Sequence, residues 1–273
     1  MGVSAQSSRK INIDMEKPEI FELSSFELTL FTSKGEKAKG KNNEDACGFL
    51  SPSPSQVALV VSDGLGGHKM GDLASKITVN TILGRASQRR RPFKSAQIIE
   101  KVEKAHQKIM DLNSDAGATV VAAVIEGDSL WFYSVGDSLG YLFSESGDVV
   151  YKTFEHSIVG FATESGIMGE EEAQQHQDSN VILNSLGFYD SRLECSLRLK
   201  MTLGETILLC SDGLTDIMTL EEMKSCIAGK GLEEASEALV VKARELQEKH
   251  EHRDDLTIVL CRKKNQSKNQ SPK

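Results

Sequence analysis

The 273-residue sequence has no long apolar run, and its N-terminus lacks a signal-peptide pattern. A helix that crosses a bilayer needs about 20 mostly apolar residues. We therefore expect a cytoplasmic protein that makes no use of a membrane. An excess of positive charge is also missing, because the formal net charge is −8. This balance argues against a nucleic-acid-binding protein.

The sequence also lacks any sign of a disulfide framework. Its five cysteines are scattered, odd in number and form no Cys-x-x-Cys motif. A reducing compartment fits this usage better than secretion does.

No Pro/Ser-rich linker and no internal repeat divides the chain. The composition, 39% hydrophobic and 26% charged, is that of a globular protein. We expect a single catalytic domain over residues 25–263. Residues 1–24 are weakly patterned and are expected to form a polar extension, and residues 264–273 a disordered polar tail.

Apolar and β-branched runs predict nine strands, and helical spacing predicts helices over 70–83, 98–112 and 232–246. The strands are expected at 26–31, 46–50, 57–62, 118–125, 130–135, 140–143, 197–201, 206–211 and 256–261. Thr219 and Glu222 have the spacing of a helix capping box. Because helices fall between hairpin-spaced strands, an α+β fold with mostly antiparallel sheets and outer helices is predicted.

Five acidic residues stand at the ends of the predicted strands. Asp63, Asp137 and Asp212 each follow an apolar strand, whereas Glu44 and Asp254 precede one. In an antiparallel sheet the end of one strand lies beside the start of its neighbour. All five carboxylates can therefore gather at one rim.

Such a cluster repels itself unless cations neutralise it. An all-oxygen site without Cys or His ligand spacing favours Mg²⁺ or Mn²⁺ over zinc. Strand-end aspartates are also common turn formers, but five in this arrangement favour the metal interpretation.

The stretch "VVSDGLGGHKMGDLAS" ends a buried strand on Asp63 and continues into glycines. A bare turn allows close backbone approach, so the Gly64 carbonyl can reach a cation beside Asp63. Gly66 and Gly67 can present N–H groups to an anion. A tight strand-to-helix connection is the alternative explanation.

Together the motifs resemble the metal-dependent protein phosphatases of the 2C type, and the bacterial branch most closely. The resemblance covers about residues 26–263. It is carried, in order, by "NNEDACGFL", "VVSDGLGGHKMGDLAS", "GATVVAAVIEGDSLWFYSVGDSLGYLF", "EHSIV", "NVILNSLG", "LGETILLCSDGLTDIM" and "RDDLTIVLCR".

The resemblance implies a β-sandwich of two antiparallel sheets flanked by helices, with a two-metal centre at one end. Asp63 would bridge both ions, and Asp212 and Asp254 would hold the first. Glu44 and the Gly64 carbonyl would hold the second.

Three further implications concern the surroundings of that centre. Asp45 would orient metal-bound water, and Asp137 with Asp212 would bind a labile third ion. The segment 156–187 would lie where the family carries a mobile flap, with His156 in a structural role.

The implied reaction is hydrolysis of phosphoserine and phosphothreonine by a water that Mn²⁺ or Mg²⁺ activates, without a covalent intermediate. The implied partners are phosphorylated proteins and a cognate serine/threonine kinase. We expect a monomer.

The sequence departs from the family pattern at three positions. Gly40 replaces an arginine that grips the substrate phosphate, and the flanking Lys39 and Lys41 offer only point charges in its place. Leu139 replaces an arginine. Asp255 replaces an asparagine, so it either raises the demand for cations or faces solvent.

These departures keep two rival functions open. One is a pseudophosphatase that serves as a binding or regulatory module, favoured by Gly40 and Leu139. The other is a phosphatase of small phosphoesters. His68, in the glycine turn, is expected to pack there rather than act as an acid.

Overall fold

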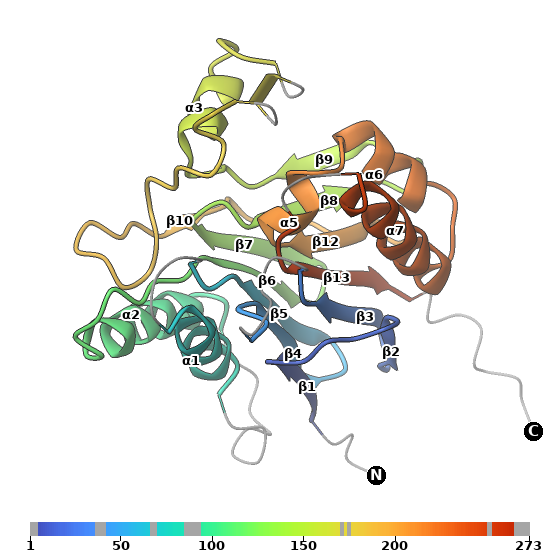
Figure 1. The fold of residues 1–273 in the computed structure, drawn as a ribbon. Helices are drawn as coiled ribbons and strands as arrows, with labels where there is room; N and C mark the ends of the chain where they lie inside the picture. The colour runs from blue at the N-terminus through green and yellow to red at the C-terminus, as the bar shows by residue number, and fades with distance from the viewer. Residues whose placement is uncertain are drawn as a thin grey trace, which may run out of the picture.

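Two antiparallel sheets face each other, and helices cover the outer face of each (Figure 1). The computed structural model describes residues 5–35, 42–65, 70–84, 94–169, 172–173, 176–249 and 253–264. Across those ranges, none of the helices has the length and apolar character needed to cross a bilayer. The predicted sandwich of two sheets with flanking helices is confirmed.

The first sheet has the order β1-β4-β5-β6-β7-β10, and β11 also pairs with β7. Its strands are β1 (Gln6–Ile11), β4 (Ala46–Ser53), β5 (Gln56–Ser62), β6 (Val120–Glu126), β7 (Ser129–Val135), β10 (Glu194–Cys195) and β11 (Leu199–Lys200). Helices α1 (Gly71–Leu83) and α2 (Gln97–Met110) pack on its outer face.

The second sheet has the order β2-β3-β13-β12-β8-β9. Its strands are β2 (Glu19–Glu22), β3 (Phe26–Ser33), β13 (Leu256–Lys263), β12 (Thr206–Cys210), β8 (Leu139–Phe143) and β9 (Val149–Lys152). Helices α5 (Asp212–Thr215), α6 (Leu220–Ile227) and α7 (Leu232–Gln247) cover it. Helix α3 (Ile158–Glu164) stands beyond the rim of the sheets (Figure 1).

Side-chain alternation along the strands produces the layers. In β5, Val57, Leu59 and Val61 enter the core between the sheets, whereas Ala58 and Val60 enter the core under α1 and α2. Successive residues of a strand point to opposite faces, so a strand with helices on one side and a sheet on the other must be apolar throughout. This explains why β5 is a continuous apolar run.

All nine strands and three helices expected from the sequence overlap elements of the structure. The capping box is also present: the Thr219 side chain accepts from the Glu222 N–H, and the Glu222 side chain accepts from the Thr219 N–H. Four short strands were missed: β1, β2, β9 and β10. Each lies at the edge of a sheet and exposes much of its surface, so its apolar signal is weak.

Two segments of the expected N-terminal extension form edge strands. Residues 6–11 pair with β4 and residues 19–22 pair with β3. Backbone hydrogen bonds to an existing edge hold them, and Ile11 and Phe21 also pack against the hydrophobic cores. The expected tail lies outside the described residues from residue 265 onward.

Leu59 tests the core between the sheets. Its side chain is fully buried there, so Leu59→Ala is expected to lower the free energy of unfolding by about 2–5 kcal/mol. Urea denaturation followed by circular dichroism measures this. The matched control is Val241→Ala on α7, where the side chain is 56% exposed and the change is expected to stay within about 0.5 kcal/mol. Equal effects of the two substitutions would contradict the layer assignment.

Candidate active site

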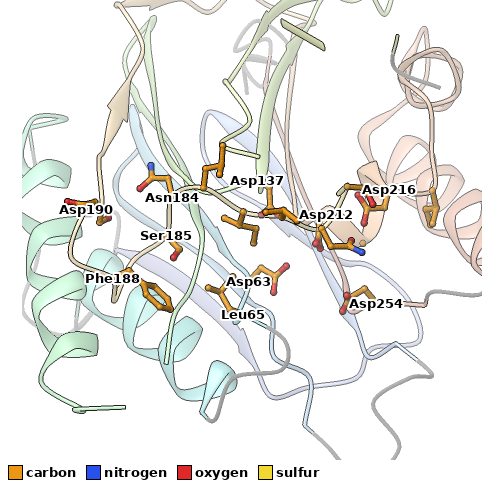
Figure 2. Close-up of a pocket in the computed structure, with 18 of the residues that line it drawn as sticks. Asp63, Leu65, Asp137, Asn184, Ser185, Phe188, Asp190, Asp212, Asp216 and Asp254 are labelled. Carbon is orange, nitrogen blue, oxygen red and sulfur yellow. The ribbon is translucent and has the colours of Figure 1, made fainter. Parts of the chain in front are cut away.

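Four of the five strand-end carboxylates line one cavity of about 970 Å³ (Figure 2). Asp63 follows β5, Asp137 lies between β7 and β8, Asp212 begins α5, and Asp254 precedes β13. The strand register explains the gathering. The end of β12 pairs with the start of β13 (Cys210 opposite Ile258), so Asp212 and Asp254 emerge at the same rim.

The fifth carboxylate, Glu44, lies on the other side of the glycine turn. Its main-chain oxygen accepts from the Gly64 N–H at 3.1 Å. A Cβ placed on Gly71 would lie 2.7 Å from Glu44 Oε1 and 3.1 Å from the Gly64 carbonyl oxygen. These two oxygens therefore converge on the space beside Gly71, which stays open because residue 71 has no side chain.

Gly64 is itself required by packing. A Cβ at this position would lie 2.2 Å from the Gly71 carbonyl oxygen and 2.9 Å from that of Glu44. The backbone of the turn can therefore approach the Glu44 segment only with glycine at residue 64.

Asp45 is fully buried behind the rim. Its Oδ2 accepts from the Ser211 hydroxyl at 2.7 Å, which ties it to the residue just before Asp212. Burial raises the pKa of the Asp45 carboxyl well above its usual value, and the nearby Asp255 adds to the shift.

Asp255 does not face solvent, so that sequence-based alternative is wrong. In addition to burial, its charge raises the pKa of Asp45 and of Asp212, in the direction of a greater demand for cations. Its carboxylate accepts from the Gly35 N–H at 2.8 Å and from the Glu44 N–H at 2.6 Å. The residue is 6% exposed. One buried carboxylate thus joins the end of β3 to the segment that carries Glu44, where an acceptor with two free oxygens is required.

His156 fixes the turn that carries Asp137. Its Nδ1 accepts from the Gly136 N–H at 3.0 Å, and its Nε2 lies 3.0 Å from a carboxylate oxygen of Glu194. Gly136 has a φ of 101°, a conformation that favours glycine. The ring therefore holds the backbone beside Asp137, in agreement with the structural role expected for it.

Three carboxyl groups at the rim, those of Asp63, Asp137 and Asp212, have raised pKa values. Burial raises the pKa of Asp63 and of Asp137 well above the usual value, and repulsion from Asp212 raises both further. Burial and then the charge of Asp254 raise the pKa of Asp212 to about 6. A cluster with such pKa values is stabilised by a bound cation.

Buried oxygens without a hydrogen-bond partner also favour a cation site. Among the described residues, they include Asp45 Oδ1, Asp137 Oδ1 and Asp212 Oδ1. Buried carboxylate oxygens are normally paired, so these fit an all-oxygen site for a hard cation. Within the described ranges, no three Asp, Glu, His or Cys side chains stand close enough to hold one ion together.

The sequence analysis missed Asp216, which also lines the cavity (Figure 2). Burial and the charge of Asp212 raise the pKa of its carboxyl. The signal was present in "SDGLTDIM": residues four apart in a helix share a face, so a helix that begins at Asp212 directs both carboxylates to one side.

Other expected positions do not join the cavity or are not described. Leu139 is buried in the core between the second sheet and its helices. Lys39, Gly40 and Lys41 lie outside the described residues, as do Gly66, Gly67 and His68.

The family model described as protein phosphatase 2C matches residues 34–257. The chain therefore belongs to the protein phosphatase 2C family, and the resemblance drawn from its motifs is confirmed.

Three known proteins show the extent of the similarity. The serine/threonine phosphatase stp of Listeria welshimeri is 30% identical, over 80% of this chain and 89% of the relative. The solved serine/threonine phosphatase of S. agalactiae has a TM-score of 0.73 and 26% identity, covering 87% of this chain and 99% of that one. The catalytic domain of the phosphatase PstP, solved with two manganese ions, has a TM-score of 0.72 and 22% identity, covering 88% and 99%.

Asp255 offers a test of how the rim is held together. Asp255→Asn replaces one accepting oxygen by an NH₂ group that faces a backbone N–H, so the free energy of unfolding is expected to fall by about 1–3 kcal/mol. Urea denaturation measures this. The matched control is Asp14→Asn, because the exposed Asp14 accepts a single backbone N–H, from Lys34, and should change stability by less than about 0.5 kcal/mol. An unchanged stability of Asp255→Asn would show that the two bonds contribute nothing.

Proposed function

We propose that this serine/threonine protein phosphatase of the 2C type hydrolyses phosphoserine and phosphothreonine in proteins with a water activated by Mn²⁺ or Mg²⁺. The observation that carries the proposal is the set of carboxylates around one cavity. Burial and mutual repulsion raise the pKa of Asp63, Asp137 and Asp212, and Asp137 and Asp212 each have a buried oxygen without a hydrogen-bond partner.

In this proposal Asp63 would be shared by two ions. Asp212 and Asp254 would help to hold one of them, and Glu44 and the Gly64 carbonyl the other. The convergence of the Glu44 and Gly64 oxygens beside Gly71 supports the second set. Asp137 and Asp212 would hold a third ion, and Asp216, at the same wall, would contribute to it.

The bound cations would lower the pKa of a water molecule and neutralise phosphoryl oxygens. The chain's own residues would position the water and the segments that carry the proposed ligands. Asp45, which accepts from the Ser211 hydroxyl, would orient the attacking water. Asp255 holds the Glu44 backbone, and His156 holds the turn of Asp137.

Lys39 and Lys41 are proposed to attract the substrate phosphate in place of the missing arginine at Gly40. As single point charges they would position it less tightly than a bidentate guanidinium does. We further propose that the enzyme acts as a cytoplasmic monomer opposite a serine/threonine kinase, and that residues 25–263 form its catalytic domain.

Hydrolysis of a phosphothreonine peptide tests the proposal. Turnover is expected with Mn²⁺ or Mg²⁺ and none with EDTA. Asp63→Asn should lower kcat/KM by about 100-fold or more, because it removes the ligand shared by both ions. Phosphate release measures the rate, and circular dichroism confirms that the variant is folded.

The rival functions predict different results in the same assay. Folded protein without turnover under any cation condition would favour a pseudophosphatase. Turnover of a sugar phosphate in preference to the peptide would favour a small-molecule phosphatase.

The pH dependence of metal-free stability tests the metal centre itself. Asp212 has a folded pKa of about 6 and a usual value of 3.8, so between these values the folded state binds more protons than the unfolded state. The contribution of Asp212 to stability is present below pH 3.8 and is lost as pH rises through 6. Cations compete with these protons, so the rise in Tm on adding Mn²⁺ should be larger at pH 7.5 than at pH 5.

Differential scanning fluorimetry with Mn²⁺ and with EDTA measures that difference in Tm. Asp212→Asn is the control, and its Tm should depend less on both pH and Mn²⁺. An equal rise in Tm at the two pH values would contradict a metal site built from these carboxylates.

A further inference from the structure

The carboxylates occupy only part of the cavity wall. Opposite them, the wall is formed by Leu65 and by the segment 179–191, which includes Val181, Leu183, Phe188 and Tyr189. In Figure 2, Leu65 lies between the Phe188 ring and Asp63. The volume of about 970 Å³ is several times that of one side chain, so a phosphorylated residue fills only part of it.

Backbone hydrogen bonds fix the apolar wall relative to Asp63. Residues 117–119 run between the Asp63 segment and the Leu186 segment. Thr119 N–H donates to the Asp63 carbonyl at 2.8 Å, and Leu65 N–H donates to the Gly117 carbonyl at 3.1 Å. On the other edge, Ala118 and Leu186 exchange two bonds, of 3.1 and 2.8 Å.

Phe188 and Leu65 then meet over a single glycine. A Cβ on Gly117 would lie 2.5 Å from Phe188 Cε2 and 2.7 Å from Leu65 Cδ1. Both side chains therefore pack on the bare backbone of residue 117 and form one continuous apolar surface. Phe188 keeps 38% of its surface exposed and lines the cavity.

The loop that carries Phe188 is closed at its base. Asn184 Oδ1 accepts from the Arg192 N–H at 2.9 Å, and Asn184 Nδ2 donates to the Arg192 carbonyl at 2.7 Å. Within the loop, Gly187 has a φ of 94° and no room for a Cβ, which would lie 2.5 Å from the Ala116 carbonyl oxygen. The aromatic ring is thus presented from a defined position.

We propose that Leu65 and Phe188 form an apolar subsite for a large aliphatic side chain next to the phosphorylated residue of a protein substrate. The proposal rests on the proposed phosphatase function. Leu65 is two residues beyond Asp63, and adjacent residues of an extended peptide lie about 3.3–3.6 Å apart along the chain. A substrate with its phosphate at the carboxylate rim therefore places a neighbouring side chain over this surface, where burial of apolar area favours binding.

Two matched pairs of phosphothreonine peptides test the subsite. One pair has Leu or Asn immediately before the phosphothreonine, and the other has Leu or Asn immediately after it. The two side chains have nearly the same shape, so only polarity differs. For one of the pairs, the Leu peptide is expected to have a kcat/KM about tenfold higher in the presence of Mn²⁺.

Substitutions test whether Phe188 causes the preference for Leu peptides. Phe188→Ala should reduce the Leu-to-Asn ratio to about one, whereas Phe188→Leu should retain most of it. Leu197→Ala is the matched control, because Leu197 is 87% exposed and lies outside the cavity, and its ratio should equal that of the unchanged protein. Tm values verify that each variant is folded.

The outcomes separate the subsite from the proposed function. Hydrolysis of all peptides with a ratio near one at both positions would overturn the subsite and leave the phosphatase intact. A ratio that survives Phe188→Ala would overturn the role of the ring. Fluorescence anisotropy with labelled forms of the same peptides and Mn²⁺ measures binding separately from hydrolysis. Preferential binding of the Leu peptides without hydrolysis would support the subsite and contradict the proposed phosphatase function.

Discussion

Mutual repulsion between carboxylates at one rim is the constraint on which the rest of the structure depends. Asp63, Asp137, Asp212, Asp216 and Asp254 line a single cavity, and among the described residues that line it there is no lysine or arginine. Moving charges away from water costs several kcal/mol per ion unless they are paired. The chain therefore builds a centre that is complete only when charge is supplied from outside.

The fold withstands this repulsion because the carboxylates stand on elements that cannot easily separate. Asp63 and Asp212 end central strands, each of which is paired on both sides. Asp255 joins the segment before β13 to Gly35 and Glu44, and Ser211, just after β12, is bonded to Asp45. The same contacts that resist repulsion also set the positions of the proposed ligands. One set of hydrogen bonds therefore stabilises the rim and positions those ligands.

The sequence was informative wherever one local rule decided the outcome. Continuous apolar runs located the central strands, and the capping box located the start of α6. Antiparallel geometry brought the strand-end carboxylates together without any knowledge of the sheet order. The glycine turn indicated that a side chain at residue 64 would obstruct a close approach, and the structure places the Gly71 and Glu44 backbones there.

Prediction failed where a residue's role depends on partners that are distant in sequence. Asp255 accepts from Gly35, 220 positions away, and nothing in "RDD" indicates that bond. The edge strands β1 and β2 are set by pairing with β4 and β3 rather than by their own composition. Phe188 joins Leu65 only because residues 117–119 lie between them, which no local pattern reveals.

The backbone hydrogen bonds of residues 117–119 connect the two walls of the cavity. It holds Asp63 on one edge and the Phe188 loop on the other, so the carboxylate wall and the apolar wall are parts of one hydrogen-bonded unit. Each bond in such a ladder limits relative motion of the strands it joins. A side chain bound in the proposed subsite would therefore lie at a set distance from the carboxylates. An aliphatic residue seated on Phe188 would orient the phosphorylated residue toward Asp63, and its binding energy would then contribute to positioning the phosphate as well as to affinity.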